Sequence, residues 1–413
     1  MFKIFQKKYF ILISLLLVFI FNTMVYASSD GDKNAEVDNQ IAEIRTFMEI
    51  QAGAVEAYNV MLESFLDEAY IPVYPDNYAG AYVERETLVI QLTDVSDTVT
   101  AFYTKLLEEY APIAFEMVEF SYNELKNIGE RFIDIYDVPH ISRGVDTKAN
   151  NYLIELDRND ESSAVRIDVL KELAAENPIY FTIGTKAQKN MLHGGSGIST
   201  FSGHFSFGTW GKFINGEIAI ITSGHPFTMT GVSASGPYAT VRQSSNNMEI
   251  GNLAVYRQTT NSYGSYITIA GGVSQYGDWS VVVIDSSLSY LKSNNVLGNS
   301  SGSILYPLTG WAYEAPVGTY IFGSGRYTQI YAGRVTYVNR DVLFDNSNYF
   351  TLGITCANFM GSLKTQNGDS GGANFYESGN QRIFCGVHVG SDGYNNTFYF
   401  SPYIWAYPYF KIN

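Results

Sequence analysis

The chain contains few of the residues that metal and nucleotide chemistry require. It has 2 cysteines and 5 histidines in 413 residues, and 16% of its residues are charged. No group of Cys and His has the spacing of zinc ligands, and no H-E-x-x-H motif, glycine-rich phosphate loop or dinucleotide fingerprint is present. The sequence therefore predicts no metal ion and no other cofactor.

Positive charge is also scarce, and it is distributed unevenly. Residues 191–413 hold 10 Lys and Arg against 10 Asp and Glu, whereas residues 1–190 hold 16 against 31. The net charge of −15 thus belongs to the N-terminal half, which argues against nucleic acid as a partner. This difference in charge indicates that residues 1–190 and residues 191–413 are separate regions of the protein with different roles.

The first 27 residues have the pattern of a secretory signal peptide. Three lysines precede an apolar run over residues 9–21, and Val25-Tyr26-Ala27 offers a small-residue cleavage site. The alternative is a membrane anchor, but this run is shorter than the roughly 20 residues that span a bilayer. We therefore expect an extracellular protein that does not associate with the membrane after signal cleavage.

With 46% apolar residues the rest of the chain can bury a large core. Residues 28–190 are expected to form an acidic α+β region. Helical spacing is present over residues 34–70, 99–109, 114–135 and 163–176, and strands are expected at 82–83, 88–92, 151–156 and 179–182. The last two strands and the helix between them predict a β-α-β unit.

At about residue 185 the composition changes. Residues 177–216 contain no Asp or Glu, and Gly194-Gly195-Ser196-Gly197 lies in the middle of them, which predicts a linker and processing region. Beyond it short strands alternate with Gly, Asn and Ser turns, so residues 191–413 are expected to be all-β. The expected strands are residues 217–222, 238–243, 253–257, 266–270, 280–284, 331–338 and 386–389.

The strongest local signal is Gly368-Asp369-Ser370-Gly371-Gly372. A nucleophilic serine needs a tight turn that glycine permits, so that backbone N–H groups converge on the oxygen that becomes negative during acyl transfer. Gly368 and Ser370 are the candidate donors of this oxyanion hole. Such a glycine-rich stretch also occurs in ordinary turns.

A serine hydroxyl needs a base, and histidine is the side chain whose ordinary pKa suits that role. His225 follows an apolar strand that ends at Gly224, which would direct the imidazole into a cleft. The alternative for His225 is a structural histidine with satisfied hydrogen bonds.

These segments resemble the chymotrypsin-like serine proteases, and most closely the bacterial streptogrisin and α-lytic type, which have an N-terminal pro-region. Thr222-Ser223-Gly224-His225 is similar to the family's T-A-G-H, residues 368–372 match G-D-S-G-G, and Asp278-Trp279-Ser280 is similar to the stretch at the catalytic aspartate. The resemblance implies a double β-barrel protease domain in which His225, Asp278 and Ser370 form the catalytic triad. Asp285 is the rival for the acidic role.

The resemblance also suggests a substrate pocket. The family's pocket positions correspond to Thr365, His388 and Ser391, a set that resembles the glutamate-preferring members, while Lys364 argues against a trypsin-like preference. The alternative for His388 is a residue of the strand's core face. Because residues 177–216 offer no acidic residue, either another protease cuts the junction or the pocket accepts other side chains.

Cys356 and Cys385 flank the serine, as a family disulfide does, and an exported chain favours their pairing. Two buried free thiols are the alternative. The resemblance further implies polypeptide substrates, a monomeric mature enzyme, and a pro-region at residues 28–190 that acts as intramolecular chaperone and inhibitor. A permanent accessory domain is the alternative for this region. For the β region the alternatives are an inactive binding protein on the same fold and an ester hydrolase.

Overall fold

The computed structural model describes residues 36–412 apart from short gaps at 69, 161–162, 187, 190–197, 201–202, 226–239, 244–248, 259–260, 263–264, 267–275, 288–294, 298–304, 345–349, 362–363 and 393–394. The predicted signal peptide and the glycine-rich residues 194–197 of the predicted linker lie outside the described residues. Within the described part, no helix has the length and apolar character needed to cross a bilayer.

The N-terminal half is α+β, as predicted. It opens with a helix over residues 36–64, whose buried face carries apolar residues at helical spacing such as Ile41, Ile44 and Met48. The following elements are β1 (Tyr78–Glu84), β2 (Thr87–Leu92), α2 (Asp97–Leu107), β3 (Ile113–Met117), α3 (Tyr122–Tyr136), β4 (Ser142–Asp146), β5 (Asn151–Asp157), α4 (Ser163–Leu173), β6 (Ile179–Gly184) and β7 (Gln188–Lys189).

The helix expected over residues 114–135 is wrong in its first part. Residues 113–117 form β3, which pairs in parallel with β2, and α3 begins after Ser121. The Ser121 hydroxyl accepts from the Glu124 amide at 3.3 Å, and the Glu124 carboxylate accepts from the Ser121 amide at 2.8 Å. This capping box starts the helix at residue 122, and the apolar residues before it are recruited by the sheet.

The predicted β-α-β unit is confirmed, because β5 and β6 are parallel and α4 connects them. The predicted pairing of the strands around residues 82 and 88 is also confirmed, since β1 and β2 are antiparallel neighbours. The N-terminal half therefore contributes the three-stranded sheet β1-β2-β3 and the strands β4, β5 and β6, which continue the large sheet of the C-terminal half.

In the described residues the C-terminal half is built mainly from strands, with a short 3₁₀ helix at Tyr403–Trp405. Eight strands form one sheet in the order β26-β10-β11-β16-β13-β12-β8-β9. Their bounds are β8 (Ile198–Thr200), β9 (Gly203–Phe205), β10 (Thr209–Phe213), β11 (Ile218–Thr222), β12 (Thr240–Gln243), β13 (Glu249–Gln258), β16 (Asp278–Ile284) and β26 (Phe410–Lys411).

Six further strands close into a barrel, because the path β22-β25-β24-β23-β20-β21 returns through a direct pairing of β21 with β22. Closure removes the unpaired edges that an open sheet would expose. The barrel strands are β20 (Tyr320–Gly325), β21 (Gln329–Leu343), β22 (Phe350–Phe359), β23 (Ala373–Ser378), β24 (Gln381–Asp392) and β25 (Thr397–Pro402). The short strands are β14 (Asn261–Ser262), β15 (Ser265–Tyr266), β17 (Asn295–Leu297), β18 (Leu305–Pro307) and β19 (Gly310–Trp311).

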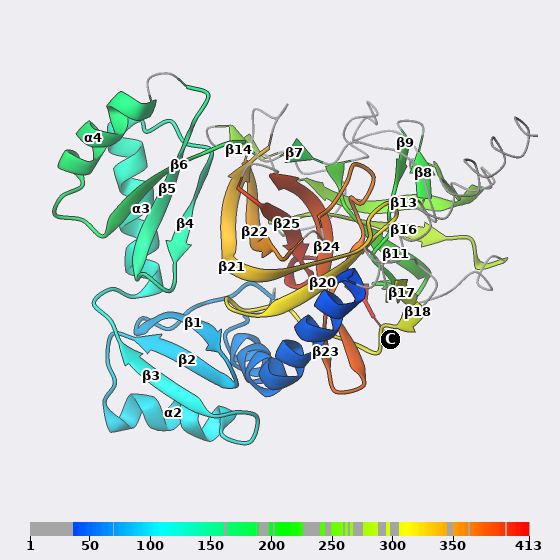
Figure 1. The fold of residues 1–413 in the computed structure, drawn as a ribbon, viewed down its shortest axis with the longest axis horizontal. Helices are drawn as coiled ribbons and strands as arrows, with labels where there is room; N and C mark the ends of the chain where they lie inside the picture. Colours follow the sequence, from blue (N-terminus) through cyan, green and yellow to red (C-terminus); the bar gives the residue numbers. More distant parts are fainter. Residues whose placement is uncertain are drawn as a thin grey trace, which may run out of the picture.

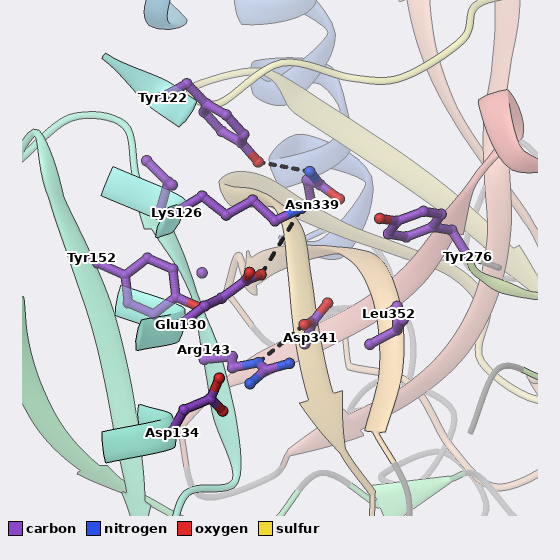
Figure 2. Close-up of a pocket in the computed structure, with 12 residues that line it drawn as sticks. Tyr122, Lys126, Glu130, Asp134, Arg143, Tyr152, Tyr276, Asn339, Asp341 and Leu352 are labelled. Atoms are coloured by element: carbon purple, nitrogen blue, oxygen red, sulfur yellow. Dashed lines mark hydrogen bonds and ion pairs between the residues drawn. The ribbon is translucent and has the colours of Figure 1, made fainter. Parts of the chain in front are cut away.

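Two of the contacts between the halves involve β4 and the N-terminal helix. Strand β4 pairs with the end of β21 and so extends the barrel sheet into β4-β5-β6, while the helix over residues 36–64, blue in Figure 1, lies against β20 and β23. A cavity of about 280 Å³ remains at the β4–β21 junction, where Arg143 forms an ion pair with Asp341 at 3.1 Å (Figure 2). Lys126 pairs with Glu130 at 4.0 Å in the same cavity. We assign no ligand to this cavity, because each of its two cations, Lys126 and Arg143, is paired with a carboxylate that also lines it.

The disulfide expected between Cys356 and Cys385 is wrong, because both thiols are free and buried. Cys356 lies on β22 and Cys385 on β24, and β25 lies between these strands. Two inter-strand spacings of roughly 4.8 Å exceed the roughly 7 Å that a disulfide can bridge between Cα atoms. Burial raises the pKa of the Cys356 thiol to about 12 and also raises that of Cys385, so both remain protonated.

Candidate active site

His225 and Asp278 are brought together by adjacent strands of the eight-stranded sheet. His225 follows β11 and Asp278 begins β16, and these strands are antiparallel, with Thr222 opposite Ser280. Most apolar residues of both strands are buried, so each strand end is held firmly. Both side chains are themselves buried, with 3% of His225 and none of Asp278 exposed.

Asp278 holds His225 through two hydrogen bonds and the preceding Gly224 through a third. Its Oδ2 lies 2.7 Å from Nδ1 of His225, and its Oδ1 accepts from the amides of Gly224 at 2.7 Å and His225 at 2.8 Å. An ionised carboxylate only accepts, so Nδ1 of the neutral imidazole must carry the proton and Nε2 must present its lone pair. The rival acid, Asp285, is exposed and accepts from Ser287 instead.

Ser370 comes from the barrel, in the turn that precedes β23. Its Oγ lies 3.1 Å from Nε2 of His225 and 3.3 Å from the carbonyl oxygen of Val389 on β24. With Nε2 unprotonated, the hydroxyl can donate to the imidazole. The three predicted side chains therefore form one hydrogen-bonded chain across the junction of the sheet and the barrel.

The glycine at 371 is required by the turn. Gly371 has φ of +84°, and a Cβ there would lie 2.0 Å from Oγ1 of Thr222. The Gly371 amide donates to the carbonyl of His388 at 2.8 Å, and the His388 amide donates to the carbonyl of Gly372 at 2.9 Å. The serine turn is thereby fastened to β24.

Asp369 fixes the other side of the turn. Its buried carboxylate accepts from the amides of Gln366 at 2.8 Å and Tyr327 at 2.9 Å, and from the hydroxyl of Thr328. Desolvation raises the pKa of Asp369, which these donors partly oppose. Asp369 thus holds the loop through neutral donors.

The candidate oxyanion donors lie on this turn. Gly368 has φ of +99°, and its carbonyl accepts from the Ser206 hydroxyl at 3.0 Å. Among the residues that the structure describes, its amide N–H donates to no acceptor. An amide of this kind is available to stabilise a developing negative charge.

The predicted pocket residues lie around the same turn. Thr365 precedes it and is half-buried, and its hydroxyl has no hydrogen-bond partner in the described part of the chain. His388 is fully buried on β24 near the ring of Tyr331, and burial lowers its pKa to about 3, with a further contribution from His225. Ser391 lies three residues further along β24.

Sequence reasoning missed two serines that support the site. The Ser206 amide donates to the carbonyl of Ser370 at 2.8 Å, and its carbonyl accepts from the Thr222 hydroxyl at 2.7 Å, so it connects the two strand systems. Ser401 on β25 accepts from the Asp278 amide at 3.1 Å. Nothing in the sequence distinguishes them from the many other serines of this half.

Comparisons with known proteins find similarity to a family of N-terminal domains and to solved proteases. Residues 44–111 match the family model of the Pro-like N-terminal domain. A search of curated proteins found no match.

About half of the chain is similar to each of several solved proteases. A glutamic acid specific serine protease, described as utilizing a novel histidine triad in substrate binding, is 22% identical with a TM-score of 0.37, over 52% of this chain and 98% of its own. Thermobifida fusca Protease A is 20% identical with a TM-score of 0.36, over 54% and 100%. Cellulomonas bogoriensis chymotrypsin is 22% identical with a TM-score of 0.34, over 54% and 98%. Because these scores are below 0.5, the function proposed below depends on the geometry of the site.

Proposed function

We propose that this chain is the precursor of a secreted serine endopeptidase in which Ser370, His225 and Asp278 cut peptide bonds through an acyl-enzyme. The observation that carries the proposal is the unbroken chain of hydrogen bonds from Asp278 through His225 to Ser370. A binding protein on the same fold has no need for this arrangement.

The proposed reaction follows from the positions of these groups. Oγ of Ser370 attacks the scissile carbonyl while Nε2 of His225 takes the proton from the Ser370 hydroxyl. The backbone amides of Gly368 and Ser370 stabilise the oxyanion that forms. The imidazolium, stabilised by Asp278, then protonates the leaving amine. Water hydrolyses the acyl-enzyme with the same histidine as base.

We propose residues 28–190 as a pro-region that inhibits the protease at residues 191–413 and assists its folding. Strand β7 supports the inhibitory role, because Gln188 and Lys189 pair antiparallel with Ser391 and Gly390 of β24. Gly390 and Ser391 directly follow Val389, whose carbonyl lies beside the Ser370 hydroxyl. The pro-region therefore reaches the strand edge along which an extended substrate would bind.

A preference for Glu or Asp before the cut bond is our proposal for specificity. The hydroxyls of Thr365 and Ser391 and the ring of His388 offer the donors that a carboxylate needs. Cleavage of matched peptides with Glu, Gln, Leu and Lys at this position tests the preference. Equal rates for Glu and Leu would reject it.

The proposed activity is tested with the secreted protein and its Ser370→Ala variant. A fluorophosphonate probe should label the wild type at Ser370 and leave the variant unlabelled. An unlabelled wild type would favour the inactive binding protein, and cleavage of a simple ester without cleavage of casein would favour the ester hydrolase. Sequencing of the N-terminus of the secreted protein tests both the export and the domain boundary.

A further inference from the structure

The carboxyl group of Glu314 is buried beneath the N-terminal helix. Glu314 is 5% exposed. Its Oε2 accepts from the Tyr58 hydroxyl of that helix at 3.2 Å, and its Oε1 accepts from the Thr355 hydroxyl of β22 at 2.9 Å. The group thus lies at the contact between the N-terminal half and the barrel region.

The helix is fastened around this carboxyl by two side-chain amides. Asn59 donates to the Glu314 carbonyl at 3.0 Å and accepts from the Glu314 amide at 3.2 Å. Gln51 in the same way donates to the Gly318 carbonyl at 2.9 Å and accepts from the Tyr320 amide at 3.0 Å. These bonds hold the helix in one register, with Tyr58 against Glu314.

No positive charge compensates this carboxyl. Within the described residues, Glu314 has no ion pair, and its polar partners are hydroxyl groups. The other titratable groups that face it are uncharged near neutral pH because burial raises their pKa values. They are Tyr58 of the helix, Tyr74, Tyr78 of β1, Tyr122 of α3 and Cys385 of β24.

We propose that Glu314 is a pH-dependent latch: its protonated carboxyl holds the helix over residues 36–64 on the barrel, and its ionisation loosens the helix. The physical reason is desolvation. A carboxylate that is buried without a cation is costly, whereas a neutral carboxyl satisfied by two hydroxyls is not. When the helix lifts, water reaches the group and the cost disappears.

The direction of the effect follows from the two pKa values. Burial raises the pKa of Glu314 from 4.5 to about 7 while the helix is docked. The docked state therefore holds the proton more tightly, and its stability is complete below pH 4.5. The equilibrium constant for docking of the helix falls by about tenfold per pH unit between about pH 4.5 and 7 and levels off above that range.

This inference deepens the proposed function, because it makes release of the proposed pro-region depend on the pH that the exported precursor meets. Its test needs no hydrolysis, so its failure is distinguishable from a failure of the proposed protease activity. The full-length Ser370→Ala variant keeps the chain uncut. Hydrogen exchange of the amides at residues 51–59 reports how often the helix opens.

After correction for intrinsic exchange rates, we expect protection of these amides to fall about 60-fold between pH 5 and pH 7.5. Adding Glu314→Gln, which is neutral at every pH, should leave protection nearly constant. The matched control is Glu63→Gln, since Glu63 is an exposed carboxylate of the same helix that accepts from Tyr313. This control should retain the full decrease.

Constant protection in the Ser370→Ala protein, or an equal decrease after Glu314→Gln, would overturn the latch. Tyr58→Phe gives a second test if Glu314→Gln does not fold. It removes a donor to the carboxylate, so the decrease should continue to a higher pH than in the parent. An unchanged profile in Tyr58→Phe would also contradict the proposal.

Discussion

Oδ1 of Asp278 accepts the amide of His225 at 2.8 Å, while Oδ2 of the same carboxylate lies 2.7 Å from Nδ1 of the same histidine. One carboxylate thus positions both the backbone and the ring of its partner. The ring therefore has little freedom to rotate. The carboxylate also stabilises the tautomer that carries its proton on Nδ1, and this leaves the unprotonated Nε2 facing Ser370.

Asp278→Asn should preserve the fold and lower kcat by about 10³ to 10⁴-fold, because the amide stabilises the wrong tautomer of His225. Steady-state kinetics on a peptide substrate measure this. Asp285→Asn is the control, and its kcat should be unchanged because Asp285 is exposed and, among the described residues, accepts hydrogen bonds from nearby Ser287. The reverse result would make Asp285 the catalytic acid.

Lys189→Pro should slow processing of the precursor by about tenfold or more. Proline removes an amide N–H and fits poorly in a paired strand, so it disturbs the pairing of β7 with β24. The measurement is the rate at which purified precursor converts to a shorter form, with N-terminal sequencing of the product. A new N-terminus within residues 178–216 would follow a non-acidic residue, so either another protease makes this cut or the pocket accepts side chains other than Glu and Asp.

Lys186→Ala is the control for that experiment. Lys186 forms an ion pair with Asp157 at 3.7 Å and precedes β7, so its loss should leave the conversion rate nearly unchanged. Conversion of Lys189→Pro at the parent rate would contradict the role given to β7.

The two cysteines should behave as thiols that become reactive only on unfolding. Denatured protein alkylated without reductant should gain two groups by mass spectrometry, and folded protein should gain none within the same time, because both side chains are buried. If the denatured protein is alkylated only after treatment with a reductant, the two cysteines form a disulfide after all.

His388 should make the fold sensitive to acid. Its pKa is lowered to about 3, whereas its ordinary value is 6.5, so the unfolded chain binds one more proton between these limits. The contribution of His388 to stability is therefore complete above pH 6.5 and falls by about 1.4 kcal/mol per pH unit below it. Urea unfolding of the Ser370→Ala protein from pH 7 to pH 5 measures this slope.

In the Ser370→Ala protein, adding His388→Gln should reduce the dependence of the unfolding free energy on pH by about 1.4 kcal/mol per pH unit, which corresponds to one proton. His140→Gln gives an independent comparison, because burial lowers the pKa of His140 to about 4, and it should remove a similar share. If the slope is unchanged in His388→Gln, the histidine is protonated in the folded protein.

The local chemistry of the site could be read from the sequence. The turn at residues 368–372 needs glycine where φ is positive, and His225 follows an apolar strand that ends at Gly224. Ser370 and His225 could therefore be found without coordinates. The spacing of apolar residues likewise predicted the helix at residues 36–64 and the pairing of β1 with β2.

Longer-range choices could not be read in this way. Residues 114–117 have an apolar pattern compatible with a helix, and only the available edge of β2 made them a strand. The cysteines flank the serine in the chain, but the return of β25 between their strands separates them. Sequence distance does not measure the distance across a sheet.

The sequence by itself determined which residue types are available for catalysis, where the charge changes and where the backbone must turn, because these depend on local composition and sterics. Only the tertiary structure decided that Asp278 rather than Asp285 faces His225, that β7 lies along β24, and that Glu314 is buried without a cation. Those outcomes depend on which distant strands pair and on what excludes water from a side chain, and both are properties of the packed chain as a whole.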